Sequence, residues 1–78
     1  MHFSEQEKSQ LLQLKYVGLT VIERLEQLGI YSFEQLAKEK TDDICRQISA
    51  AMGSSCWKNS PQAKAAINAA IALAKRES

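Results

Sequence analysis

Apolar residues recur along this chain at intervals of three and four, the spacing that gathers side chains on one face of an α-helix. Such stripes occupy residues 11–14, 21–28, 44–52 and 63–74. No segment alternates apolar and polar residues as a half-buried strand would, and no segment is of low complexity. The pattern therefore predicts an all-α fold, a compact bundle of about five short helices.

Polar residues just before the apolar stripes predict where helices begin. A serine or threonine followed three residues later by Glu or Gln has the capping-box spacing, in which the two side chains satisfy backbone N–H groups at the start of a helix. The chain has this spacing at Ser4–Glu7, Thr20–Glu23 and Ser32–Gln35. We therefore expect helices over about 5–14, 21–28 and 33–38, the last being a short connector.

Glycine and proline mark helix boundaries further along the chain. Gly29 and Gly53 each follow an apolar stripe, where a left-handed glycine commonly ends a helix. Thr41 precedes two aspartates that suit the positive end of a helix dipole, so we expect it to cap the next helix. Ser60-Pro61 should open the last helix, because proline at the first helical position loses no needed donor. The expected core residues of these two helices, about 41–52 and 61–75, are Ile44, Ile48, Ala51, Met52, Ala63, Ala66, Ile67, Ala70, Ile71 and Ala74.

The segment 14–20 joins the first two predicted helices as a tight hairpin. Gly18 lies where the chain must turn, and glycine allows this without steric penalty. The backbone N–H groups after Gly18 should be unpaired and point outward at a helix N-terminus, which is a favourable place for an anion. Nucleic acid is the most abundant polyanion of a cell. The hairpin is therefore a candidate phosphate-binding element.

The run from Leu14 to Ile30 resembles the helix-hairpin-helix motif of DNA-binding proteins that act without sequence specificity. That motif reads apolar-x-Gly-apolar-Gly, then a short helix, then Leu-Gly-Ile. Tyr16 stands at the first glycine of the motif, Val17 at the apolar position and Gly18 at the second glycine. The positions further on are matched by Ile22, Leu25, Leu28, Gly29 and Ile30. The sequence departs from the motif at Tyr16, whose ring could restrict how closely a phosphate approaches.

The rest of the chain is similar to short bacterial proteins of the pathogenicity-locus family, some of which carry the label mitomycin resistance protein. The similarity includes Cys56-Trp57, Ser60-Pro61 and an Ala-rich last helix. It implies a DNA-binding fold and no established biochemical activity. The helix order also matches the duplicated, SAM-like form of the motif within a single domain, 1–78, with 53–60 as a lengthened and degenerate second hairpin.

Charge argues for weak binding. The 78 residues carry a formal net charge of +1, whereas a free-standing nucleic-acid binder usually presents a clearly basic face. Residues 1–30 hold three Lys or Arg against four Glu, and 61–78 carry a net charge of +2. Any basic face must therefore be assembled by folding.

The residues needed for enzyme or metal chemistry are sparse. His2 is the one histidine, and it lies at an end that we expect to be frayed. The two cysteines, Cys45 and Cys56, lack the paired spacing of a zinc or redox site, so we expect free thiols and no disulfide. We therefore expect no enzyme activity, catalytic residue, metal or cofactor. No apolar run reaches 18 residues and no signal peptide is evident, which favours a cytoplasmic protein without a membrane partner.

Two functions remain in view, with the oligomeric state open. The first is weak, sequence-independent DNA binding through hairpin amides and nearby basic side chains. The second is a small helical protein-interaction or dimerisation module, which the low net charge suits. Tyr16 and Trp57 could each stack on a base or instead close the small core. The expected DNA-binding residues are Lys15, Tyr16, Val17, Gly18, Leu19, Thr20, Arg24, Lys58 and Lys64.

Overall fold

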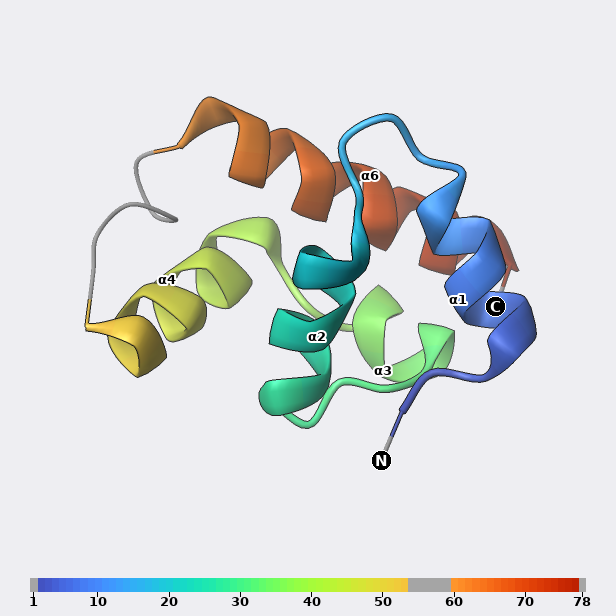
Figure 1. Ribbon diagram of the computed structural model, residues 1–78, viewed down its shortest axis with the longest axis horizontal. Helices are drawn as coiled ribbons and strands as arrows, with labels where there is room; N and C mark the ends of the chain where they lie inside the picture. The colour runs from blue at the N-terminus through green and yellow to red at the C-terminus, as the bar shows by residue number, and fades with distance from the viewer. Residues whose placement is uncertain (1, 54–59, 78) are drawn as a thin grey trace.

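The computed structural model describes residues 2–53 and 60–77. Its helices are α1 (Glu5–Leu12), α2 (Leu19–Gln27), α3 (Phe33–Ala37), α4 (Thr41–Met52) and α6 (Pro61–Glu77) (Figure 1). No strand occurs within the described residues. The prediction of an all-α bundle with about five short helices is confirmed.

The core is built against α6, the longest helix. Both α3 and α4 pack on α6, which Figure 1 shows running along the top of the molecule. Ala66, Ala70 and Ala74 are at most 1% exposed, and their small side chains let the other helices approach α6 closely. The largest fully buried side chains are Leu11, Ile22, Leu25, Leu36, Ile44, Ile48 and Ile67. Each apolar stripe thus contributes residues to one core.

The first helix is shorter than its apolar stripe suggested. We expected it to reach residue 14, but α1 ends at Leu12, whose side chain is 41% exposed rather than part of the core. The N–H groups of Gln13 and Leu14 bond to the carbonyls three residues earlier, at 3.2 and 3.1 Å. This tighter turn ends the helix, and it leaves Leu11 buried and Leu14 half-buried.

Three of the predicted helix starts are confirmed, those of α1, α3 and α6, the last of which begins at Pro61 with the Ala63 N–H donating to Ser60 Oγ at 3.2 Å. The Glu7 N–H donates to Ser4 Oγ and the Ser4 N–H donates to Glu7 Oε1, both at 3.2 Å, so the first capping box is complete. Ser32 Oγ accepts the Gln35 N–H at 3.2 Å. The reciprocal bond is replaced, because Gln35 Oε1 accepts the Tyr31 N–H instead of that of Ser32.

The predictions that Thr20 and Thr41 are N-caps were wrong, because both threonines lie inside the first turn of their helices. Helix α2 begins at Leu19 with Gly18 as its N-cap, so Thr20 already lies in the first turn. Helix α4 begins at Thr41 itself with Lys40 as its N-cap. The Thr41 hydroxyl hydrogen-bonds across to Asn68 on α6 and thereby ties the two helices together.

The two glycines that follow α2 and α4 end those helices as predicted. Gly29 has φ +85° and Gly53 has φ +66°, both in the left-handed region. At Gly29 the N–H groups of residues 29 and 30 bond to the carbonyls of Glu26 and Leu25, each at 3.0 Å. This is the Schellman arrangement, which satisfies carbonyls that the helix end would otherwise leave unpaired.

The buried face of α4 differs from the expected one at its end. Ile44 and Ile48 are buried as predicted, but Cys45 and Ser49 complete the face. Ala51 and Met52 are exposed: Ala51 lies off the repeat 44, 45, 48, 49, and Met52, which would continue it, is the last residue of the helix. The expected second hairpin, 53–60, falls almost wholly outside the described residues, as do Cys56, Trp57 and Lys58.

The N-terminal segment is held in place, contrary to the expectation of a frayed end. Phe3 is 5% exposed, and its ring lies 6.5 Å from that of Phe33. The Phe3 N–H donates to Glu26 Oε2 at 2.9 Å, and His2 Nδ1 lies 3.1 Å from Glu26 Oε1. Glu7 adds a second link by accepting the Phe33 N–H at 2.9 Å. Residues 2 and 3 therefore join α1 to α2 and α3.

Candidate nucleic-acid interface

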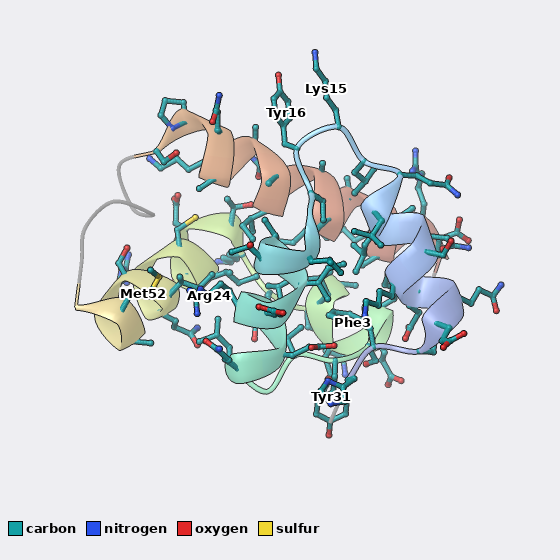
Figure 2. All side chains as sticks on the ribbon, viewed as in Figure 1. Phe3, Lys15, Tyr16, Arg24, Tyr31 and Met52 are labelled. Atoms are coloured by element: carbon teal, nitrogen blue, oxygen red, sulfur yellow. The ribbon has the colours of Figure 1, made fainter. Side chains whose placement is uncertain are left out.

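The hairpin between α1 and α2 has an inward and an outward side. Val17 is 6% exposed and Leu14 is half-buried against the core. The Val17 N–H donates to the Leu14 carbonyl at 3.2 Å and closes the turn. Lys15 and Tyr16, which lie between Leu14 and Val17, point away from the body of the molecule (Figure 2). We call the exposed residues Lys15, Tyr16, Gly18, Leu19 and Thr20 the hairpin tip.

Gly18 has a conformation that does not require glycine. Its φ of −124° and ψ of −176° are extended, as is usual for an N-cap, and a Cβ built on it would meet no atom within 4 Å. Its carbonyl accepts the Ile22 N–H at 3.2 Å. The expectation that the turn depends on glycine at this position was therefore wrong, because the N-cap conformation and the space around it would also admit a residue with a side chain.

The start of α2 differs from the other described helix starts. Serine hydroxyls accept N–H groups at the starts of α1, α3 and α6. Helix α4 has no side-chain cap, but its first turn contains Asp42 and Asp43. Helix α2 has neither a side-chain cap nor an acidic residue in its first turn. The positive end of the α2 dipole thus lacks the capping serine or the acidic side chains that the other helix starts have.

Charge and apolar surface meet at the hairpin tip. The Lys15 ammonium lies 5.5 Å from the centroid of the Tyr16 ring, within the range of a cation–π contact. Tyr16 is 48% exposed and Leu19 is 55% exposed. Tyr16 therefore does not shield the core, which was the alternative to a stacking role. Lys15 is the one charged residue between positions 13 and 22.

Folding brings together six of the nine expected DNA-binding residues, those from position 15 to 20. Val17 is one of these six, but its side chain is buried, so it can offer an outside partner its backbone alone. Arg24 turns away from the tip: its guanidinium donates to Gln27 Oε1 at 3.1 Å, and it lines a hollow together with Met52 of α4. Figure 2 shows Arg24 beside Met52 and well apart from Lys15 and Tyr16.

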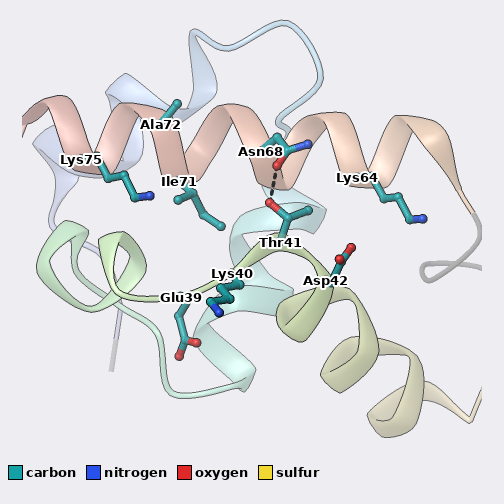
Figure 3. Close-up of a pocket in the computed structure, with 9 residues that line it drawn as sticks. All are labelled: Glu39, Lys40, Thr41, Asp42, Lys64, Asn68, Ile71, Ala72 and Lys75. Carbon is teal, nitrogen blue, oxygen red and sulfur yellow. Dashed lines mark hydrogen bonds between the residues drawn. The ribbon is translucent and has the colours of Figure 1, made fainter.

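Lys64 belongs to a different part of the surface. It lines a groove of about 560 Å³ between α6 and the start of α4, where no hairpin residue contributes (Figure 3). Three lysines and two carboxylates line this groove, so charge of both signs is present. The charged residues are Lys40, Lys64, Lys75, Glu39 and Asp42. Sequence reasoning missed the groove, although the 11-residue spacing of Lys64 and Lys75, three helical turns, places both on one face of α6.

Other chemistry is limited in the part of the chain that the structure describes. No three His, Cys, Asp or Glu residues there are grouped so as to hold a metal ion. Cys45 is buried and free, and burial raises the pKa of its thiol. No helix within residues 2–53 and 60–77 is long and apolar enough to cross a membrane.

Comparison with known proteins yields no match to a family model, a curated protein or a solved structure. The candidate interface therefore rests on the geometry of the hairpin tip.

Proposed function

We propose that the hairpin tip binds DNA without sequence specificity by receiving a backbone phosphate at the N-terminus of α2. The observation that carries this proposal is the start of α2, where an exposed glycine replaces a capping side chain and no carboxylate occupies the first turn. Backbone N–H groups and the helix dipole at such a position favour an anion. Because these groups contact phosphate and no base edge, they carry no sequence information.

Three features of the hairpin tip support a phosphate in this place. The open space around Gly18 allows an oxygen to come close to the backbone. The exposed Lys15 supplies the nearest positive charge in sequence, and the Thr20 hydroxyl offers a further donor. With one cation at the tip and a net charge of +1, the binding is expected to be weak, in the range typical of non-specific contacts.

A salt titration tests the proposal. The affinity for a short duplex, measured by fluorescence anisotropy at several salt concentrations, should fall as salt rises. Lys15→Gln should lower the slope of log K against log salt by about one counterion. Lys38→Gln is a matched control, because it removes the same charge from an exposed lysine at the end of α3, where it costs no more than a weak surface pair. Absence of salt-dependent binding by the unmodified protein at tens of micromolar would reject the proposal.

A second candidate function, docking of a protein partner, is favoured by the large exposed side chains of Tyr16 and Leu19. Leu19→Lys separates the two functions because they predict changes in binding affinity of opposite sign. A lysine at this exposed first position of α2 adds a cation where phosphate is expected, so DNA binding should strengthen and its salt slope should steepen. An apolar docking surface would instead lose a contact, and binding to its partner would weaken.

A further inference from the structure

Tyr16 is an aromatic residue that the fold itself does not use. Its side chain is 48% exposed and extends outward from the hairpin (Figure 2). The ring contact that the structure gives it is with the Lys15 ammonium, at 5.5 Å. The other tyrosine of the chain, Tyr31, is half-buried and lies at the opposite end of the molecule in the same view.

An exposed ring next to a cation suits a nucleic-acid base better than a phosphate. The face of a base stacks on an aromatic side chain whatever the base is, and single-strand binders combine such rings with positive charge that follows the backbone. At the hairpin tip the ring and the positive charge are close in sequence. Lys15 precedes Tyr16, and α2 begins three residues after Tyr16 without a side-chain cap. One strand could therefore place a base on Tyr16 and a neighbouring phosphate at Gly18.

We propose that Tyr16 is a stacking platform for an unpaired base, so that the hairpin tip prefers single-stranded nucleic acid to duplex. Inside a duplex both faces of each base are covered by neighbouring bases, and the ring can reach a face only if a base leaves the stack, at a cost in free energy. The inference rests on the proposed function, since the phosphate contact at α2 holds the strand beside the ring.

The test compares three probes of equal length: a labelled oligothymidylate, its duplex with oligoadenylate, and an abasic strand that keeps the phosphates but lacks bases. The oligothymidylate should bind tighter than the abasic strand by roughly 5- to 150-fold, the range for stacking of one base. Tyr16→Leu should remove most of this ratio, because it should lower the affinity for the oligothymidylate more than the affinity for the abasic strand. Tyr16→Phe should retain the ratio, because the stacking face is kept.

Tyr31→Leu serves as the matched control, with circular dichroism to confirm that both leucine variants stay folded. Equal affinity for the oligothymidylate and the abasic strand, or an unchanged ratio in Tyr16→Leu, would overturn the stacking role and leave the phosphate contact standing. Tighter binding to the duplex than to the single strand would also overturn it. Failure of all three probes to bind at low salt would overturn the proposed function and this inference together.

Discussion

Replacement of Gly18 by aspartate should stabilise the protein and abolish the proposed binding of DNA. Gly18 has the extended backbone of an N-cap, but without a side chain it cannot form the capping hydrogen bond to the N–H groups of α2. Aspartate ranks above glycine as an N-cap by a few tenths of a kcal/mol, and a carboxylate at the positive end of a helix contributes about 0.3–1 kcal/mol. A Cβ at this position meets no atom within 4 Å, so no steric cost offsets the gain.

The expected gain in the free energy of unfolding is therefore about 0.5–1 kcal/mol, or roughly 2–8 °C in Tm for a domain of this size. The effect on binding has the opposite sign, because the carboxylate accepts the N–H groups that a phosphate would use and also repels it. Gly18→Asn separates these two contributions. It provides a similar cap without the charge, and should stabilise the protein while weakening DNA binding less than aspartate does.

Thermal unfolding followed by circular dichroism gives the stability, and anisotropy at low salt gives the affinity. If the aspartate variant binds DNA as tightly as the unmodified protein, the phosphate is not bound at the start of α2. A fall in Tm would show instead that Gly18 is not available as an N-cap. The pair of measurements is decisive because a merely damaged fold lowers both quantities together.

Three further predictions concern the fold. Gly29→Ala should lower the free energy of unfolding by about 1–2 kcal/mol without a direct effect on DNA binding, since its φ of +85° is strained for any residue with a Cβ; urea titration measures the loss. Burial raises the pKa of Glu26, but the hydrogen bonds from His2 and the Phe3 amide outweigh it, so the pKa is lowered from 4.5 overall. The stability that Glu26 contributes is thus present above pH 4.5 and is lost as pH falls through the lowered pKa. Glu26→Gln should therefore reduce the difference between the urea midpoints measured at pH 7 and pH 3. An undiminished difference would contradict this prediction. Cys45, whose buried thiol has a raised pKa, should react slowly with a thiol reagent in the native state and quickly in denaturant, which mass spectrometry of the Cys45 peptide distinguishes.

Sequence periodicity predicted the helices better than it predicted their ends. An apolar stripe identifies the face of a helix, but Leu14 fits the stripe equally well from the turn that follows α1. The spacing of a capping box likewise favoured Thr20, whereas α2 starts two residues earlier from a glycine that has no side chain to signal it. Left-handed glycines were predictable at Gly29 and Gly53, because no other residue ends a helix in that way at so little cost.

The candidate site was predictable where it is contiguous in sequence. The hairpin tip occupies neighbouring positions, so the turn itself brings its residues together. The direction of Arg24 depends on how α2 packs on α4, which periodicity along one helix does not determine. The bonds from Phe3 and His2 to Glu26 span 23 and 24 residues, and no local pattern connects such positions.

We expect changes at the hairpin tip to leave the fold intact, because other residues form the core beneath it. Leu11, Val17 and Ile22 are each at most 6% exposed and fix the path of the chain into and out of the turn. The residues above them are exposed, and a side chain at Gly18 would enter open space. A sequence selected for stability alone would place a capping residue at position 18 and polar residues at positions 16 and 19. The chain has a glycine, a tyrosine and a leucine there, and these are the exposed positions that the proposed contact with DNA would use.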